Sequence, residues 1–256
     1  MRVTKSTSES VKVALAERTA SVAPSNSTLA KQVPFDGIEV SSRAAIPFTH
    51  KAWLGFGSSA GIELVSENST NELYALKTFK RYLGRNFEAF YRSFQNEVCV
   101  TQRLSSHKHI VSVCQTYKWG RQLSILLSPA ASDGDLGAYI AEIFGAGMSK
   151  EQRKVLNRAF GCLASGLAYM HRQKIRHKDI KPQNILIHQG SVLYTDFGIS
   201  FDADDDNTTT IGYVGAFTRR YCAPEVQDHT RRDRKSDVYS LGCVFVEILD
   251  VLEPQL

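Results

Sequence analysis

Two stretches of this chain place hydrophobic residues at helical spacing. Between residues 85 and 104 one face is formed by Phe87, Phe90, Phe94, Val98 and Thr101. A second stripe, between residues 150 and 173, is formed by Val155, Phe160, Leu163, Leu167 and Met170. Positions three or four residues apart share one side of a helix, so both stretches predict amphipathic helices. Small residues, Gly161 and Gly166 among them, lie between the positions of the second stripe and predict a slim helix that packs centrally.

Shorter apolar runs predict strands. From Ile46 onward these runs are broken by glycine, and the segment from Leu54 to Ile62 predicts two strands joined by a flexible turn. Short buried strands are further predicted at residues 111–117 and 123–127, and two short strands that flank a turn at residues 185–187 and 192–194. A last apolar helix is expected to begin near Ser236 and to continue through Leu249.

The first 45 residues lack such a pattern. They are rich in Ser, Thr and Ala, which is typical of disordered segments, and we expect a disordered leader over residues 1–45. A short helix could form within it at residues 11–18. The basic, hydroxyl-rich start has some likeness to a mitochondrial presequence, but Glu9 and Glu17 argue against import.

Composition narrows the class of protein. The 256 residues are 43% hydrophobic and 22% charged, which suits one large domain or two lobes. No apolar run reaches membrane-spanning length and no signal peptide is evident, so we expect an intracellular chain, cytoplasmic or nuclear, without a membrane partner. The five cysteines form no CxxC pair, and neither a zinc site nor a disulfide framework is expected. The net charge of +5 is mild, and the basic cluster at 231–235 predicts a solvated loop rather than a nucleic-acid site.

The chemistry-bearing residues gather in His177-Lys178-Asp179-Ile180-Lys181-Pro182-Gln183-Asn184 and in Asp196-Phe197-Gly198. Phosphoryl transfer is stabilised mainly by positioning, cations and Mg²⁺, and these segments offer groups for each task. Asp179 would orient the attacking hydroxyl and Lys181 would neutralise the moving phosphoryl group. Asn184 and Asp196 would supply the hard oxygen ligands that Mg²⁺ prefers.

These two segments resemble the catalytic loop and the DFG motif of eukaryotic protein kinases. The resemblance extends from about Phe48 to the end of the chain. It implies an α+β, bilobal fold, with a small antiparallel β-sheet lobe that carries one regulatory helix and a mainly helical large lobe that lacks its last helices. The expected boundaries are a kinase domain at 46–256, divided into a small lobe at 46–127, a hinge at 128–135 and an incomplete large lobe at 136–256.

The resemblance also implies an ATP site. Lys77 is surrounded by apolar residues, so it is read as a buried cation that needs an acidic partner. Glu97 on the regulatory helix is the preferred partner, and Glu88 is the competing one. The residues expected to enclose the nucleotide, besides Lys77, are Leu54, Gly55, Gly57, Ile62, Ala75 and Leu186.

The implied hinge begins at Ser128, which would occupy the gatekeeper position, and includes Ala130. Asp135 or Asp133 could contact the ribose of ATP. Either could instead cap the helix that follows, and we expect one of the two to be that N-cap. Asp237, near the start of the last helix, is expected to accept backbone N–H bonds from the catalytic loop.

An activation segment is implied between Ile199 and Glu225, with Thr218 in its last part and with Thr208, Thr209, Thr210 and Tyr213 as candidate phosphorylation sites for an upstream kinase. Lys178 stands where the family has an arginine. Because lysine lacks the bidentate fork of arginine, we expect a weaker response to phosphorylation.

Several departures from the family pattern qualify these expectations. Ala60 replaces a glycine, Ser59 an aromatic residue and Thr101 an aliphatic one. The chain ends soon after the last predicted helix, so a truncated product is expected, with Glu225 lacking an arginine partner. The apolar residues expected to need cover are Val244, Ile248, Leu249 and Val251.

Two functions remain open at this point. The first is a protein serine/threonine kinase that uses ATP and Mg²⁺ to phosphorylate Ser or Thr of protein substrates. Lys181-Pro182 and Thr218 resemble the serine/threonine branch. The second is a non-catalytic, pseudokinase-like nucleotide-binding or scaffold protein, or an inactive fragment.

Overall fold

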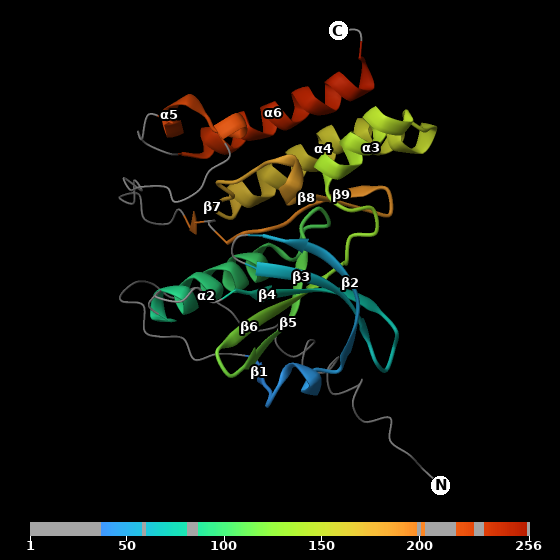
Figure 1. Ribbon diagram of the computed structural model, residues 1–256. Coiled ribbons are helices and arrows are strands. Elements are labelled where there is room, and N and C mark those ends of the chain that lie inside the picture. Colours follow the sequence, from blue (N-terminus) through green and yellow to red (C-terminus); the bar gives the residue numbers. More distant parts are fainter. Residues whose placement is uncertain are drawn as a thin grey trace.

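A computed structural model of the chain shows two lobes, one built on a β-sheet and one built mainly of helices (Figure 1). The structure describes residues 37–57, 60–80, 87–198, 201–202, 219–227 and 233–254. The predicted α+β bilobal class is confirmed. Within the described residues, no helix combines the length and the apolar character needed to cross a membrane.

The sheet lobe contains six strands in the spatial order β1-β5-β6-β4-β3-β2. Their bounds are β1 Ile38–Glu39, β2 Phe48–Phe56, β3 Ala60–Glu67, β4 Leu73–Phe79, β5 Ser112–Trp119 and β6 Gln122–Ser128. Strands β2 to β6 pair in antiparallel fashion. The register places Lys77 of β4 opposite Ile62 of β3 and Ile125 of β6, in the middle of the sheet.

Strand β1 corrects the predicted leader and the predicted sheet. It pairs with β5 in parallel, so the sheet is not wholly antiparallel. Val40 N–H donates to Lys118 O at 2.9 Å, and the Lys118 ammonium lies 3.1 Å from a Glu39 carboxylate oxygen. A single 3-10 turn follows at Arg43–Ala45. Order therefore begins before residue 46, because a short backbone ladder and an ion pair attach this segment to the sheet edge. Residues 1–36 of the expected leader lie outside the described residues.

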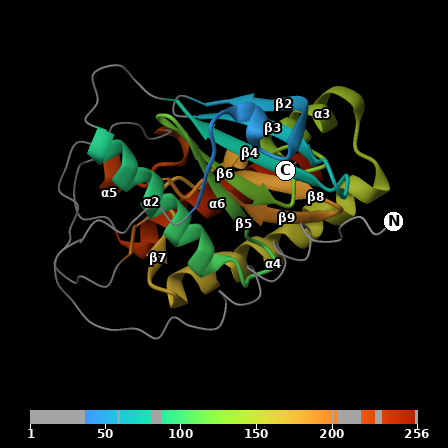
Figure 2. The same cartoon turned by 90° about the horizontal axis from the view of Figure 1, so that it is seen from below.

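Helix α2 (Phe87–Leu104) packs on the sheet lobe, as the apolar stripe predicts. Phe94 is buried, and its ring lies 5.3 Å from that of Phe79 on β4 in an edge-to-face arrangement. Figure 2, seen from below, shows α2 beside the sheet and α4 beneath the strands of the larger lobe.

The larger lobe contains helices α3 to α6 and two short β-ribbons. Its helices are α3 Leu136–Ala146, α4 Lys150–Arg172, α5 Pro224–Gln227 and α6 Arg234–Leu252. Its strands are β7 Ile175–Arg176, β8 Ile185–His188, β9 Ser191–Tyr194 and β10 Phe201–Asp202, with β8 paired to β9 and β7 to β10. Helix α4 begins at a capping box, in which Ser149 and Gln152 satisfy each other's backbone N–H groups.

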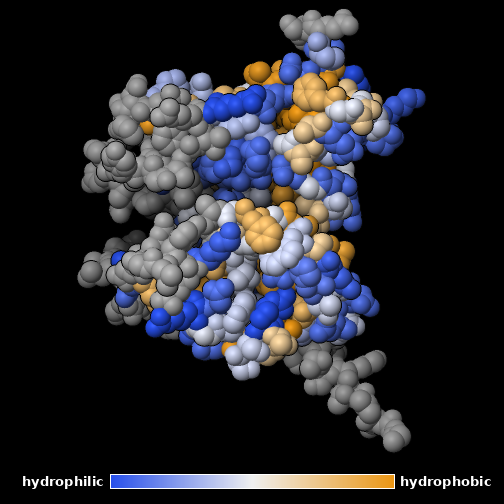
Figure 3. Space-filling view, viewed as in Figure 1, coloured by the Kyte–Doolittle hydropathy of each residue, from blue (hydrophilic) through white to orange (hydrophobic). Residues whose placement is uncertain are grey.

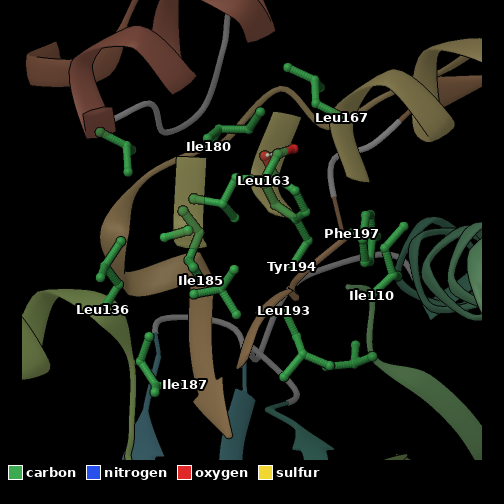
Figure 4. Close-up of a cluster of buried hydrophobic side chains, with 14 of the residues drawn as sticks. Ile110, Leu136, Leu163, Leu167, Ile180, Ile185, Ile187, Leu193, Tyr194 and Phe197 are labelled. Atoms are coloured by element: carbon green, nitrogen blue, oxygen red, sulfur yellow. Dashed lines mark hydrogen bonds between the residues drawn. The ribbon is translucent and has the colours of Figure 1, made fainter. Parts of the chain in front are cut away.

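The core of the larger lobe lies under the loop that connects β7 to β8 (Figure 4). Ile180, Leu163, Tyr194 and Phe197 are buried there, and the Tyr194 hydroxyl donates to Leu163 O at 3.0 Å. Gly166 of α4 permits this packing, because a Cβ at that position would lie 2.9 Å from the Tyr194 ring. The small residues of α4 thus let β9 approach the helix closely.

Helix α6 corrects another expectation. Val244, Ile248 and Val251, which were expected to be uncovered, are buried, whereas Leu249 is exposed. The three buried residues belong to the main core, where α6 packs against α3 and α4. On the face seen in Figure 3, hydrophilic residues cover most of both lobes and hydrophobic residues appear in separate small groups.

Candidate active site

A buried lysine joins the two lobes. Lys77 Nζ on β4 lies 2.5 Å from Glu97 Oε1 on α2 and 2.7 Å from Asp196 Oδ1, which follows β9. Lys77 and Glu97 are almost fully enclosed, whereas 46% of the Asp196 side chain is exposed. The structure therefore brings together the three residues that the sequence places far apart. Glu88, the competing partner, instead pairs with Arg92 one turn away on the surface of α2.

The charges of this group are unbalanced, since two carboxylates share one ammonium. Burial would lower the pKa of Lys77, but Glu97 and Asp196 outweigh it and hold that pKa above its usual value. Burial raises the pKa of Glu97, and the attraction of Lys77 does not fully offset it. The nearby Lys77 ammonium is the main reason that the pKa of Asp196 is lowered. The excess negative charge is exposed at Asp196, where a cation could bind.

The backbone around Asp196 is shaped for this contact. Asp196 has φ 64°, in the left-handed region that Asp tolerates better than most residues. A Cβ on Gly198 would lie only 3.0 Å from Glu97 Oε2, so a glycine lets the segment pass close to the carboxylate. Strained backbone of this kind is concentrated at functional sites.

The loop between β7 and β8 forms a second interlocked group. Lys181 Nζ donates to Asp179 Oδ2 at 2.6 Å, and Asn184 Nδ2 donates to the same oxygen at 2.9 Å. Asn184 also donates to Asp179 O at 2.8 Å, so the amide side chain is fixed from two directions. Thr195 N–H donates to Asn184 O at 3.0 Å, which ties this loop to the segment that carries Asp196.

Asp237 holds the loop from below. Its carboxylate accepts the N–H groups of His177 at 3.0 Å and Lys178 at 2.9 Å, the bonds that were expected of it. Lys178 has φ 68°, so the loop bends sharply where it is held. His171, which was not predicted from the sequence, places its Nε2 3.0 Å from Asp237 Oδ2. His171 lies in the last turn of α4, next to the apolar stripe. That position alone does not predict its role, which becomes clear only from its contact with Asp237 of α6.

The residues expected to enclose a nucleotide come from strands β2, β3 and β4 of the sheet lobe, with the turn after β2, and, for Leu186, from β8 of the larger lobe. Gly57 N–H donates to Ala60 O at 2.8 Å and closes the turn between β2 and β3, where Leu54 is exposed and Gly55 has open space around it. Ala75 is buried in the main core, and Ile62 and Leu186 pack against that core while remaining partly accessible. Ser58 and Ser59 lie outside the described residues.

The segment expected to be the hinge is held against β8. Ser128 ends β6, and Ala130 is buried beyond it. Ile187 N–H donates to Gly134 O at 2.9 Å, and Asp133 N–H donates to Ile187 O at 3.2 Å. Of the two aspartates, Asp135 is the N-cap, because its side chain accepts Ala138 N–H at 3.0 Å. The Asp133 side chain accepts from Ser132 Oγ at 3.0 Å.

Thr208, Thr209, Thr210, Tyr213 and Thr218 lie outside the described residues. Two residues that depart from the family pattern, Thr101 and Ala60, are among the described residues. Thr101 is buried, and its hydroxyl donates to Glu97 O at 2.7 Å. Ala60 is buried at the start of β3.

Comparison with known proteins identifies the family. The protein kinase domain model matches residues 48–255. Mitogen-activated protein kinase kinase 1 of Arabidopsis thaliana is 30% identical over 197 residues, covering 76% of this chain and 52% of that protein. MAP kinase kinase kinase wis4 of Schizosaccharomyces pombe is 30% identical over 191 residues, covering 70% of this chain and 13% of that protein. Serine/threonine-protein kinase pakA of Talaromyces marneffei is 29% identical over 204 residues, covering 79% and 30%.

The chain thus spans about half the length of the Arabidopsis relative and less of the other two. The matched region contains both interlocked groups and the sheet that carries Lys77. On the family match and the fold together, this chain belongs to the protein kinase family.

Proposed function

We propose that this chain is a protein serine/threonine kinase that transfers the γ-phosphate of ATP to a hydroxyl of a protein substrate. The observation that carries the proposal is the meeting of Lys77, Glu97 and Asp196, with the Asp179 group tied to the same segment through Thr195. Such a set provides a cation for phosphates, an exposed carboxylate for a metal and an acid for the hydroxyl.

Asp179 is proposed to position the attacking hydroxyl. Lys181 and Asn184 both donate to its Oδ2, and Oδ1 has no partner among the residues that the structure describes. Oδ1 is therefore the atom proposed to accept the substrate hydroxyl. Lys181, held 2.6 Å from Asp179, would place its charge beside the phosphoryl group during transfer.

Lys77 is proposed to bind the α- and β-phosphates of ATP. Its ammonium is locked by Glu97, so it would be presented to a phosphate in one position. Positioning of this kind lowers the barrier because the entropy of orientation is lost before the reaction. Ile62, Ala75 and Leu186 would form apolar walls for the adenine, with Ser128 and Ala130 at its edge.

Asp196 and Asn184 fit a Mg²⁺ site. Mg²⁺ is bound through one or two carboxylates together with substrate phosphates and waters. One carboxylate and one amide side chain suit such a shared site. When bound, Mg²⁺ would supply charge neutralisation for the phosphates, and the excess negative charge at Asp196 favours it.

The substrate class is proposed from two observations. Relatives of this chain are named as serine/threonine-protein kinases, and the catalytic loop contains Lys181-Pro182, which resembles that branch. We therefore propose Ser or Thr of proteins as the acceptor. An upstream kinase acting between Ile199 and Glu225 remains part of the same proposal.

Replacement of Asp179 tests the proposal most simply. With purified chain and labelled ATP in Mg²⁺, Asp179→Asn should lower phosphate transfer at least about 100-fold, the scale of a lost acid or base. Nucleotide binding should persist, because Asp179 is not among the residues proposed to bind ATP. Asp250→Asn, on the exposed side of α6, is the matched control and should retain activity.

Two results would contradict the proposal. Equal transfer by wild type and Asp179→Asn would show that Asp179 does not position the hydroxyl. A wild-type chain that binds ATP and Mg²⁺ but transfers phosphate to no protein would instead identify the non-catalytic alternative.

A further inference from the structure

A pocket of about 340 Å³ lies apart from the residues proposed for catalysis. It forms where three segments meet: the loop after α2, the start of the hinge at Pro129 and the turn between β8 and β9. Its apolar wall consists of Ile110, Pro129 and Leu193. Its polar groups include Lys108, Ser112, His188, Gln189 and Ser191. The pocket contains no carboxylate among its lining residues, so its polar side is made of neutral and cationic groups.

His188 carries the clearest sign that something binds here. It ends β8, opposite Ser191 of β9. Its ring Nδ1 is enclosed and has no hydrogen-bond partner within the described part of the chain. Buried polar atoms in folded proteins nearly always have a partner, so this atom calls for a partner that the described residues do not supply.

Ser191 and Lys108, which also line the pocket, each have a hydrogen-bond donor that could bind a ligand. His109 Nδ1 donates to Val192 O at 3.0 Å and lies 3.4 Å from Ser191 Oγ. Because that ring nitrogen carries the proton, Ser191 Oγ is the acceptor, and the hydroxyl proton of Ser191 is left to donate elsewhere. Lys108 is exposed and forms no ion pair in the ranges that the structure describes.

The surroundings also favour an anion. The pKa of His107, another lining residue, is lowered first by burial, and the nearby charges of Arg172 and Lys108 add to the shift. Of these groups Lys108 lines the pocket, and its charge would interact favourably with negative charge placed there. The combination of unpaired donors and uncompensated cations is poorly suited to a cation or to a purely apolar ligand.

We propose that this pocket binds a phosphate group, held by Lys108, His188 and Ser191. A phosphate monoester offers only acceptor oxygens and carries nearly two negative charges at neutral pH, which matches a set of donors without acids. The ligand would connect the loop after α2 to the β8–β9 turn, and so would link the two lobes behind Pro129. Inorganic phosphate and a phosphoserine side chain share this chemistry.

The test uses the full-length chain with inorganic phosphate, at constant ionic strength and with saturating ATP analogue and Mg²⁺ to fill the nucleotide site. In NMR spectra of ring-labelled histidines, phosphate should shift the signals of His188. Calorimetry should then show binding weakened about tenfold in Lys108→Gln, the loss expected for one charge-assisted hydrogen bond. Lys154→Gln, an exposed lysine of α4, is the charge-matched control and should bind like wild type.

Two variants at His188 test whether phosphate binding depends on the hydrogen-bond donor or on the shape of the side chain. His188→Leu removes the Nδ1 donor and should weaken phosphate binding about tenfold. His188→Asn places an amide N–H near the position of Nδ1 and should lose less. Thermal unfolding of each variant checks that the chain is folded, so a loss of binding cannot be mistaken for a loss of structure.

A serine peptide and its phosphoserine form identify the source of the phosphate. Tighter binding of the phosphopeptide than of inorganic phosphate would assign a protein ligand, and the reverse order would assign a free ion. The inference is overturned if phosphate leaves the His188 signals unchanged, or if Lys108→Gln and Lys154→Gln bind phosphate equally well. These outcomes do not depend on phosphate transfer by Asp179.

Discussion

At the scale of single residues, the site is centred on Lys77 and on the carboxylates of Glu97 and Asp196 that contact it. Buried charges are costly unless they are paired, and removing one partner leaves the others uncompensated. The Lys77–Glu97 pair is buried, while Asp196 connects it to the accessible side. Lys77 is therefore expected to matter for stability as well as for nucleotide binding.

Lys77→Met should lower the free energy of unfolding by about 3 kcal/mol near neutral pH, because Glu97 and Asp196 are left as unpaired neighbours. The gap to wild type should narrow as the pH falls. Wild type loses the stability that Asp196 contributes as pH falls through its lowered folded pKa, below the unfolded value of about 3.9. In the variant, protonation of the two carboxylates instead relieves their repulsion.

Denaturant unfolding of both proteins from about pH 7 to about pH 3 measures this gap, a window that extends below the ordinary carboxyl pKa values. Lys118→Met, which removes an exposed ion pair with Glu39, is the control and should cost less than about 1 kcal/mol. A gap for Lys77→Met that stays constant across this pH range would show that the carboxylates do not depend on Lys77.

At the scale of helices and strands, α4 supports the catalytic loop through close packing on β9. Gly166 faces the Tyr194 ring, whereas Gly161 of the same helix has nothing within 4 Å of an added Cβ. The two glycines therefore play different parts although both interrupt a helix. Gly166 is needed for the close approach of β9, whereas at position 161 glycine only weakens the helix.

Gly166→Ala should destabilise the chain by about 1–3 kcal/mol, the usual cost of overpacking a core. Gly161→Ala should stabilise it by about 0.5–1 kcal/mol, because alanine is the better helix former. Thermal or denaturant unfolding of the two variants side by side measures both changes. Equal stability of Gly166→Ala and Gly161→Ala would show that the Tyr194 ring does not require a glycine at position 166.

Much of the element order could be predicted because apolar periodicity depends on local sequence. The helices expected at 85–104 and 150–173 correspond to α2 at Phe87–Leu104 and α4 at Lys150–Arg172 within the described residues. Periodicity does not reveal which neighbour covers a face, so Val244 and Ile248 were expected to be exposed although α3 and α4 bury them. For the same reason β1, which depends on pairing with the distant β5, was missed.

In the candidate site, too, residue types could be predicted from the sequence, whereas contacts between distant segments could not. The types and spacing of residues singled out Lys77, Asp179, Asn184 and Asp196, and the structure brings Lys77 to Asp196 and Asn184 to Asp179. The choice between Asp133 and Asp135 required the backbone of the hinge, since only the structure shows which carboxylate reaches Ala138 N–H. His171 was missed because its contact with Asp237 spans 66 positions of the chain.

At the scale of the whole molecule, the two lobes are joined through the site itself. Lys77 and Glu97 belong to the sheet lobe and Asp196 to the helical lobe, so a nucleotide held by these residues would contact both. The loop after α2 adds a second connection, because Val111 N–H donates to Tyr194 O at 3.1 Å and Tyr194 N–H to His109 O at 2.9 Å. The central claim is that residues of both lobes act on one ATP with Mg²⁺.

Calorimetric titration with ATP in Mg²⁺ tests this claim most directly. Lys77→Met in the sheet lobe and Asp196→Asn in the helical lobe should each weaken binding by about tenfold or more, as expected for the loss of a charged contact. Lys118→Met should bind ATP like wild type. Unchanged ATP affinity in either Lys77→Met or Asp196→Asn would contradict the account.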